Sequence, residues 1–434
     1  MFCDKKVNVL LGAGASARIA PSTYDITQSL LGWTRYMPSQ PMLDFTTALS
    51  QTHYQGGNQK KYFQALFELV SPFIDSPTDF LHFERLIFLS SQLDSFTTGR
   101  VRDLYSTGVK SLVRPLFSVR KKARGFDNKL IHNGVTEEAC SYILDYVTIS
   151  YSSRPDLHLL PMNKFFKELD GESVSLNIFS LNYDAIPSHC GLDFETGFNR
   201  RQSGQNFFSL ASLYESEKKH SFIQLHGSSL FGYPGNNGYG KYLVVRCDDE
   251  QSALSNRQST LSSGTWNQDG SQNPHRLMIT GMRKADFLLD EPFAAYFHKF
   301  RADLFKTPRM LLVGYGGGDR HVNESIQSAM DFWKEKGQRL KIVWIGYAPD
   351  NCFEDGVATW DQGSKVLGTC GNTIGQTFGA DVANYLGHPR TLWRIKRNEV
   401  QRVALENIDL IFSFKGTDLT FSENQEAIAS FLSI

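Results

Sequence analysis

Short apolar runs alternate with segments of helical periodicity on both sides of a long middle region. The strands that this pattern predicts cover residues 7–11, 175–181, 222–225, 241–246, 310–313 and 341–345. The helices that accompany them are predicted at residues 24–36, 287–305 and 321–336. Strands that alternate with helices form parallel sheets with helices on their faces, so we expect an α/β fold with a mostly parallel sheet.

The middle of the chain, from residue 41 to 170, has a mostly helical pattern. Helices are predicted there at residues 61–70, 79–93, 101–114 and 137–149. We therefore expect an α/β domain made of residues 1–40 and 171–350, with residues 41–170 as a large helical insertion or cap. Residues 250–275 are rich in serine, glutamine and asparagine, and this composition predicts a mobile loop.

The last part of the chain, residues 351–434, has a less regular pattern. Residues 408–414 and 419–421 predict a hairpin around Lys415 and Gly416, and a final helix is predicted near 423–432. We expect this part to be an α/β extension that either completes the domain or mediates assembly.

The charge and cysteine content narrow the class of protein. The 434 residues carry 45 Lys or Arg and 45 Asp or Glu, so no global charge attracts nucleic acid. A basic cluster at residues 114–124 is either solvated surface or a local contact for nucleic acid or a partner. The six cysteines contain no C-x-x-C pair, so we expect no zinc module and no metal. No leader-like segment and no apolar run of about 18 residues is present, which predicts a soluble, cytoplasmic protein.

A glycine turn directly follows the first predicted strand. It consists of Gly12, Ala13 and Gly14, and helical potential begins at about Ser16. Small residues at such a turn let the backbone approach a ligand, and N–H groups at a helix N-terminus attract anions. Gly12-x-Gly14-x-x-Ala17 also satisfies the relaxed dinucleotide fingerprint, although similar turns occur in folds that bind no nucleotide.

Polar or glycine-rich segments come directly after three further predicted strands. These segments are Asn182–Asp184, His226–Ser228 and Gly314–Asp319. Ligands of open α/β sheets bind outside the carboxyl ends of the strands, so we expect all four segments to meet at one edge of the sheet.

A purely structural interpretation exists for each of these residues. Asn182 could cap a following helix or bond its own turn, and His226 could be a satisfied core histidine. Gly314–Gly318 could form a flexible turn with Asp319 as the N-cap of the next helix. His321 is expected on the solvent side of that helix, and Glu84 is expected to be paired or solvated.

The four motifs GAGAS, LNYD, LHGS and VGYGGGD, in this order, resemble the sirtuin-like NAD-binding family. They are more similar to its bacterial anti-phage branch, whose members hydrolyse NAD, than to its protein deacylases. The motifs span residues 12–319, and the resemblance implies a Rossmann-like sheet that binds NAD+ as its substrate.

The resemblance also implies a role for each matching residue. Gly12, Ala13 and Gly14 would approach the diphosphate of NAD+, with the Ser16 hydroxyl as an added donor. Asn182 would hold the nicotinamide ribose and a water, and His226 would be the catalytic histidine. Asp184 would contact the nicotinamide amide, and Gly314 and Gly316 would lie against the adenosine half. Gly227 and Asp319 complete the candidate cofactor-binding residues.

Chemistry makes these residue types sensible. Cleavage of the N-glycosidic bond of NAD+ builds positive charge on the ribose, while nicotinamide leaves as a neutral molecule. An amide can orient water without adding a charge, and an imidazole that titrates near neutrality can accept its proton. Nicotinamide is already a good leaving group, so positioning should supply most of the acceleration.

The chain departs from protein-deacylating sirtuins in three ways. It lacks their zinc-binding cysteine pairs, it has Tyr183 where isoleucine is usual, and it lacks their acyl-lysine-binding strand after His226 and Gly227. These departures disfavour deacylation and leave NAD binding untouched.

The resemblance therefore implies an NAD+ glycohydrolase that depletes NAD+ in an infected bacterial cell. Such an activity is toxic unless it is regulated, by autoinhibition, oligomerisation or a partner. We expect a homo-oligomer with residues 41–170 as its assembly surface. A HerA-type ATPase or, second, a short Argonaute is the expected partner, and no membrane is involved. The alternatives are a non-catalytic subunit that binds NAD or ADP-ribose, and, less favoured, a protein deacylase.

Overall fold

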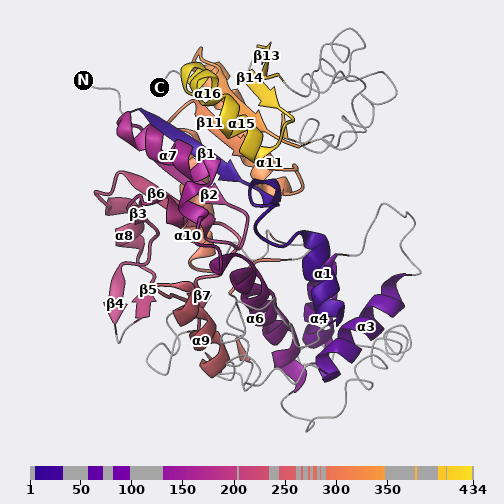
Figure 1. The fold of residues 1–434 in the computed structure, drawn as a ribbon. Coiled ribbons are helices and arrows are strands. Elements are labelled where there is room, and N and C mark those ends of the chain that lie inside the picture. The colour runs from indigo at the N-terminus through magenta and orange to yellow at the C-terminus, as the bar shows by residue number, and fades with distance from the viewer. Residues whose placement is uncertain are drawn as a thin grey trace.

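The computed structural model describes residues 5–32, 57–71, 82–97, 131–202, 205–233, 244–260, 265–266, 272–273, 277–280, 284, 290–347, 377–378, 399–406 and 408–432. These residues form an α/β fold around an eight-stranded sheet that is mostly parallel and is flanked by helices (Figure 1). This arrangement confirms the expected α/β class and is consistent with a Rossmann-like fold.

The central sheet has the strand order β13-β14-β12-β11-β1-β2-β6-β3. Its strands are β1 (Lys6–Leu11), β2 (Ser175–Ser180), β3 (Phe194–Glu195), β6 (His220–Gln224), β11 (Arg309–Val313), β12 (Leu340–Ile345), β13 (Gln401–Ala404) and β14 (Ile408–Ser413). Neighbouring strands pair in parallel, apart from the antiparallel pair β13 and β14. The central strands are buried on both faces, which explains why their sequences are continuous apolar runs.

The register of the central strands aligns their carboxyl ends. Leu11, the last residue of β1, lies opposite Val313 of β11 and Ser180 of β2. Ser180 in turn lies opposite Gln224, the last residue of β6. The segments that follow these four strands therefore begin at the same edge of the sheet.

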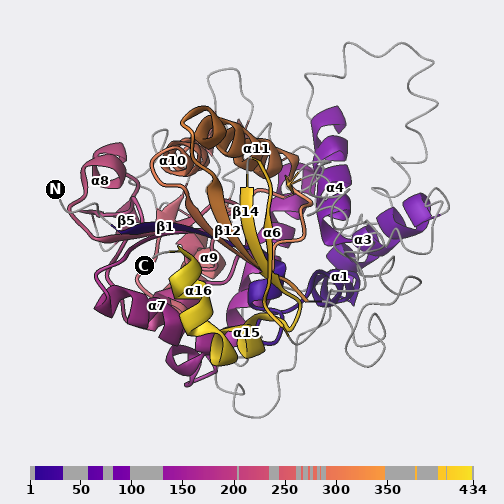
Figure 2. The same cartoon turned by 90° about the horizontal axis from the view of Figure 1, so that it is seen from above.

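Helices cover both faces of the central sheet. Helix α7 (Pro161–Gly171) packs against β2 and α15 (Thr417–Glu423), and α16 (Gln425–Leu432) packs against β12. Helices α10 (Phe293–Leu304) and α11 (Arg320–Glu335) pack against each other, and α11 also contacts β12. Figure 2 shows α10 and α11 on one side of the strands and α7, α15 and α16 on the other.

A group of packed helices lies on the side of the sheet where β1 ends (Figure 1). It consists of α1 (Thr23–Gly32), α3 (Gly57–Val70), α4 (Phe83–Thr97) and α6 (Ile131–Ser152), which contact one another. These helices confirm the predicted helices at 61–70 and 137–149, and those at 24–36 and 79–93 over residues 24–32 and 83–93; residues 33–36 and 79–81 lie outside the described part. The helix predicted at 101–114 and the whole basic cluster at 114–124 fall on residues 98–130, outside the described residues.

Several other described elements are short. They are η1 (Ala13–Ala15), η4 (Leu157–Leu159), η5 (Ile186–Cys190), β4 (Arg200–Gln202), β5 (Gln205–Phe207), α8 (Leu210–Glu215), β7 (Phe231–Gly232), β8 (Val245–Arg246), β9 (Thr265–Trp266) and β10 (Gln272–Asn273). A second, antiparallel sheet has the order β4-β5-β8-β7, and β9 pairs with β10. The strand predicted at 241–246 is thus confirmed only as β8, since residues 241–243 lie outside the described part.

The prediction of a mobile loop over residues 250–275 is wrong for its first half. Residues Glu250–Thr260 form helix α9, which packs against α6 and β7. The sequence is too polar to show a helical stripe, but Ala253 and Leu254 are buried, and Arg257 is fully buried against Asp145. Contacts with the rest of the fold, rather than local periodicity, stabilise this helix.

The hairpin predicted over residues 408–421 is also wrong. Residues 408–413 form β14 as expected, but Gly416, at φ 85°, is the N-cap of α15, so residues 419–421 are helical. Strand β14 pairs instead with β12 on one side and β13 on the other, and it is buried throughout. The final helix is confirmed as α16.

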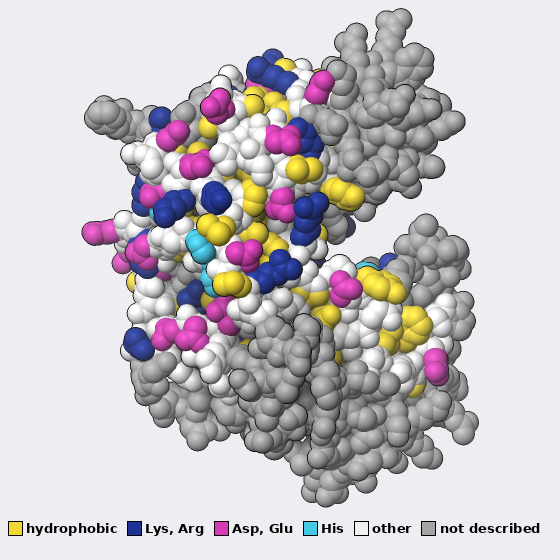
Figure 3. All heavy atoms as spheres, viewed as in Figure 1, with side chains coloured by type: hydrophobic (Ala, Val, Ile, Leu, Met, Phe, Trp, Pro, Cys, Tyr) yellow, Lys and Arg dark blue, Asp and Glu magenta, His cyan; other side chains and the backbone are white. Residues whose placement is uncertain are grey.

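The surface seen in Figure 3 carries mixed charge. On the described part of this face, basic and acidic side chains are interspersed, and no large area has a single sign. This distribution agrees with the zero net charge of the chain. Among the described helices, none is both long and apolar enough to cross a membrane.

Candidate functional site

A cavity of about 290 Å³ lies where the central strands end and the packed helices begin. Nine of the eleven residues predicted from the sequence line it, namely Gly12, Ala13, Ser16, Asn182, Asp184, His226, Gly314, Gly316 and Asp319. Gly14 and Gly227 do not. The opposite wall is formed by helical residues, among them Phe83, Glu84 and Val147. The aligned register of β1, β2, β6 and β11 is what brings these distant segments together.

The two glycine turns pack directly against each other. A Cβ atom added to Gly12 would lie 2.6 Å from the carbonyl oxygen of Gly314, and one added to Gly14 would lie 2.8 Å from the Gly314 Cα. Gly314 itself has φ 62°, in the left-handed region that favours glycine. The close approach of two backbones therefore requires these glycines, whether or not a ligand binds.

This packing also uses the N–H groups that we expected to face an anion. The N–H of Gly12 donates to the carbonyl of Val313, and the N–H of Gly14 donates to the carbonyl of Gly314. The helix expected from Ser16 is also wrong, since only the short turn η1 follows β1 and α1 begins at Thr23. An anion would have to find other donors in the cavity.

The N-terminus of α1 also lies at the cavity. Pro21, Thr23 and Ile26 line the cavity, so the first turn of this helix faces it. Ser22 and Asp25 form a reciprocal cap, in which each side chain accepts a hydrogen bond from the backbone N–H of the other. The positive end of the helix dipole is therefore directed at the cavity.

A short hydrogen-bond relay joins the end of β2 to the first glycine turn. The Nδ2 of Asn182 donates to the carbonyl of Gly12 at 2.9 Å and to Oγ of Ser16 at 3.1 Å. Ser16 donates in turn to Asp184 at 2.7 Å, and Asp184 also accepts from the N–H of Ile186. Asn182 thus bonds across the two strand ends, rather than capping a helix or bonding its own turn as the structural interpretation had it.

Burial raises the pKa of Asp184, because its carboxyl group is removed from water in the middle of this relay. Tyr183, between the two polar residues, is also buried and donates to the carbonyl of Ile279. The relay therefore fixes the Asn182 amide at the cavity wall through protein contacts alone.

His226 follows β6 and is only 2% exposed, yet its Nε2 has no hydrogen-bond partner among the described residues. It is therefore not the satisfied core histidine of the structural interpretation. Burial and then the charge of Lys284 lower its pKa to about 3, so the ring is neutral at pH 7. Our expectation of an imidazole that titrates near neutrality is wrong for this environment.

Gly227, next to His226, has a structural role. Its φ is 109°, and an added Cβ would lie 2.8 Å from the Cα of Met278, the residue with which it forms a β-bridge. The adjoining backbone of His226 accepts a hydrogen bond from the N–H of Ile279. This close pairing fixes the backbone that carries the His226 ring.

Three charged side chains form a cluster beside His226. The Nζ of Lys284 lies 3.0 Å from Glu84 Oε1 and 2.9 Å from Asp319 Oδ1. Burial would by itself lower the pKa of Lys284, but the two carboxylates outweigh it and raise this pKa. Glu84 is thus a paired helix residue, as expected, and the pair joins α4 to the sheet side of the cavity.

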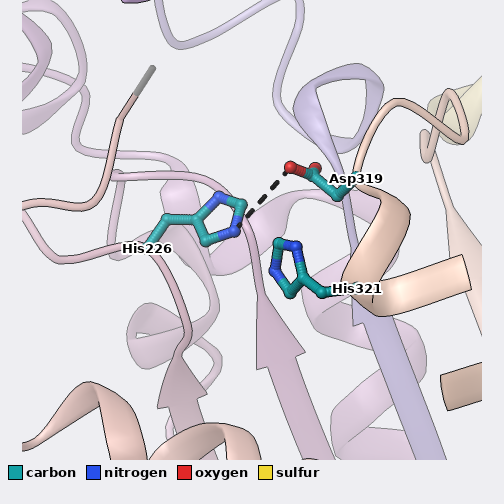
Figure 4. A group of neighbouring side chains, drawn as sticks. All are labelled: His226, Asp319 and His321. Carbon is teal, nitrogen blue, oxygen red and sulfur yellow. Dashed lines mark ion pairs between the residues drawn. The ribbon is translucent and has the colours of Figure 1, made fainter. Parts of the chain in front are cut away.

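Asp319 occupies the N-cap position of α11, but its side chain makes no cap hydrogen bond. Its Oδ1 lies 3.9 Å from Nε2 of His226 instead (Figure 4). Burial would raise the pKa of Asp319, but His226 and Lys284 outweigh this effect and lower the pKa to about 2. Because His226 is neutral at pH 7, Lys284 is the charge that keeps Asp319 ionised there.

The prediction that His321 faces solvent is wrong. Its ring lies 5.7 Å from that of His226 and 5.2 Å from that of Phe297, measured between centroids. Its Nε2 is buried and has no hydrogen-bond partner among the described residues. Burial lowers the pKa of His321, so a second neutral imidazole lies against the first.

Sequence reasoning missed Lys284 and the inward orientation of His321. Lys284 follows no recognisable strand end, and nothing in its neighbourhood distinguishes it from a surface lysine. His321 was detectable in principle, because it comes two residues after Asp319 on a helix whose first turn must pass the same edge of the sheet.

The assembled cavity combines an oriented amide, a neutral imidazole with an available nitrogen, a helix N-terminus and one buried ammonium. These groups can hold an anion, orient a water and accept one proton. No protein-family model matches this chain, and a search of curated proteins found no match either.

Proposed function

We propose that the protein is an NAD+ glycohydrolase of sirtuin-like type, which cleaves NAD+ to nicotinamide and ADP-ribose. One observation carries this proposal: Asn182 and His226 lie in the same cavity as both glycine turns, at the carboxyl edge of a parallel sheet. The order of the motifs in the sequence and their position around one cavity both support the proposal.

The reaction needs a water, a proton acceptor and a fixed ribose. The electron pair of the N-glycosidic bond leaves with nicotinamide, and the water oxygen forms the new bond to the ribose carbon. The amide of Asn182 orients this water, and Nε2 of His226 accepts its proton. A pKa of about 3 suffices, because a water bonded to a cationic ribose carbon becomes a strong acid.

The size of the cavity bears on how the substrate is held. About 290 Å³ is at the lower end of the range of roughly 300–1,000 Å³ for ligand pockets. The nicotinamide ribose is the part of the dinucleotide that fits inside, next to Asn182. The N-terminus of α1 and the ammonium of Lys284 would attract the diphosphate.

The biological role that fits this activity is bacterial anti-phage defence by depletion of NAD+. Uncontrolled hydrolysis would be toxic, so the active form requires a trigger. We propose a homo-oligomer that acts with a HerA-type ATPase or a short Argonaute, with residues 41–170 as the assembly surface.

The test is to incubate the purified protein with NAD+, alone and with the product of the neighbouring gene, and to measure nicotinamide by chromatography. Asn182→Ala and His226→Ala should each reduce turnover by about 10²–10⁴-fold, the usual contribution of a positioned proton acceptor. The matched control is His298→Ala, since His298 is an exposed histidine on α10.

Other results would identify the alternatives. If NAD+ binds but remains intact in every combination, the protein is a binding subunit that senses NAD or ADP-ribose. Nicotinamide released only in the presence of an acylated peptide would instead indicate a deacylase.

A further inference from the structure

Two imidazoles and a carboxylate converge at the edge of the cavity, which His226 and Asp319 line. One ligand atom from each of His226, Asp319 and His321 lies within 4.8 Å of the other two. Figure 4 shows the two rings and the carboxylate around a common space, with His226 coming from the end of β6 and the other two from the start of α11.

Both histidines have a buried nitrogen without a partner. Nε2 of His226 and Nε2 of His321 make no hydrogen bond to the described residues, although buried polar atoms are nearly always bonded. Oδ1 of Asp319 is 3.9 Å from Nε2 of His226, which is beyond hydrogen-bond distance. Leaving a buried nitrogen without a partner lowers the stability of the fold, so the position of these two nitrogens requires an explanation.

The His226 ring is already held as metal-binding histidines are held. It makes a hydrogen bond to the backbone of Leu181, which leaves Nε2 as the nitrogen directed into the space. A ligating histidine typically donates its other ring N–H to a carbonyl or carboxylate, which fixes the tautomer and the orientation of the ring.

We propose that His226, Asp319 and His321 bind a divalent transition-metal ion, of which Zn²⁺ is the representative. Two imidazoles and one carboxylate suit zinc, whereas magnesium and calcium prefer oxygen ligands alone. A tetrahedral ion with bonds of about 2.0 Å separates its ligands by about 3.3 Å, so small side-chain rotations close the present gaps. The fourth position faces the cavity and is left for water.

This proposal departs from our expectation of no metal, which rested on the cysteine pattern and so considered only thiolate ligands. The cysteines that the structure describes, Cys140, Cys190 and Cys247, are not members of this cluster.

Lys284 competes with the metal for the same carboxylate. Its ammonium lies 2.9 Å from Asp319 Oδ1 and also bonds Glu84, so the cluster already holds a cation that is tethered to the chain. Binding of a metal displaces this ammonium from Asp319, and Glu84 remains as its partner. Removal of the lysine charge should therefore strengthen metal binding.

Metal binding would inhibit the hydrolase, and this consequence rests on the proposed function. The metal takes the lone pair of Nε2 on His226, which is the acceptor for the proton of the attacking water. Zn²⁺ bound at this site therefore keeps the enzyme inactive until the metal leaves.

The first test measures binding without any activity. The full chain is treated with a chelator, freed of it and titrated with Co²⁺, which reports tetrahedral nitrogen and oxygen ligands through its visible absorption bands. His321→Gln should weaken binding by at least about 100-fold, since losses of supporting residues alone cost 10–100-fold. His298→Gln, which removes an exposed histidine, should leave the titration unchanged.

A second variant keeps the test decisive if His321→Gln does not fold. Lys284→Met should tighten Co²⁺ binding at least tenfold, because it removes the competing ammonium. Absence of the visible bands in the wild type, or a thiolate-to-cobalt band that persists in His321→Gln, would overturn the proposal.

The activity measurement separates this proposal from the proposed function. Zn²⁺ should reduce NAD+ turnover in the wild type and should do so at lower concentration in Lys284→Met. If Co²⁺ binds but no condition yields turnover, the metal site stands and the proposed hydrolase fails. If turnover occurs and Co²⁺ does not bind, only the metal site is refuted.

Discussion

At the residue scale, His226 combines deep burial with a ring nitrogen that has no hydrogen-bond partner among the described residues. Burial keeps the ring neutral, and Gly227 fixes its backbone by pairing closely with Met278. A neutral imidazole can act as a proton acceptor over the whole physiological pH range. Because a histidine with a pKa of about 3 is a weak base, it can accept a proton only from a group that is itself strongly acidic.

The low pKa of His226 predicts a specific dependence of stability on pH. The unfolded chain binds a proton near pH 6.5, whereas the folded chain does so only near pH 3, so stability falls as the pH drops between these values. Lys284, Asp319 and His321 face the ring and stay in place in His226→Gln. This variant should lose less stability than the wild type between pH 7 and 5, by up to about 1.4 kcal/mol per pH unit.

Urea unfolding at pH 7 and pH 5, in the presence of a chelator, measures this difference. His298→Gln serves as the control because its ring is exposed. Equal losses of stability in the wild type and in His226→Gln would contradict the prediction.

Alanine substitutions at Gly314 and Gly316 should distinguish a glycine that the fold requires from one that leaves space for a ligand. Gly314→Ala should lose more than about 2 kcal/mol of unfolding free energy, because φ is 62° and the new Cβ would meet the backbone of Gly14 and Ala15. Gly316→Ala should change stability by less than about 0.5 kcal/mol, because nothing lies within 4 Å of its added Cβ.

Gly316 lines the cavity, so the added methyl group should nevertheless weaken NAD+ binding. Calorimetric titration of both the variant and the wild type checks this expectation. Unchanged affinity in Gly316→Ala would show that the adenosine half does not lie against this turn.

Much of the candidate site could be predicted at this scale because its residues directly follow strands. Asn182 and His226 each come two residues after a buried strand, and the sheet register brings them together. Lys284 could not be found in this way, because its place depends on a tertiary contact with Glu84 on another element. The low pKa of His226 likewise depends on burial, which a short motif does not reveal.

At the scale of elements, α9 depends on one buried ion pair. Arg257 is completely buried and donates to Asp145 and to the backbone carbonyls of Ser229 and Phe231. It therefore joins α9 to α6 and to the segment that follows His226.

Arg257→Met should destabilise the protein by about 3–5 kcal/mol, because Asp145 would lose its guanidinium partner in a buried position. Arg301→Met on the exposed side of α10 should stay within about 0.5 kcal/mol of the wild type. Chemical denaturation of both variants measures these changes, and a stable Arg257→Met protein would show that α9 is held by its apolar contacts alone.

The elements that sequence reasoning misjudged share one cause. Helix α9 has a polar sequence, and α15 follows a glycine that also suits a hairpin turn, so local pattern favoured a loop in one case and a strand in the other. In both cases, tertiary contacts determine that the segment is helical. The strands of the central sheet were predictable because burial on both faces makes each a continuous apolar run.

At the scale of the whole molecule, the end of the described chain returns to its beginning. Phe421 on α15 packs against Phe165 of α7, with 5.0 Å between ring centroids. The hydroxyl of Thr417 donates to the carbonyl of Gly14, and Asp418 lies 3.4 Å from Arg18. The first glycine turn is thus supported by residues about 400 positions later in the sequence.

The position of β1 between β2 and β11 has a consequence for synthesis of the protein. During synthesis, β1 is made first and can pair with β2 and β11 only after these strands have been made, and β11 begins at Arg309. At about 5–20 residues per second, synthesis of the chain between β1 and β11 takes at least roughly 15 seconds. A cavity assembled from both neighbours cannot form before β11 has been synthesised, so a chain that stops before residue 309 lacks the Gly314 side of the cavity.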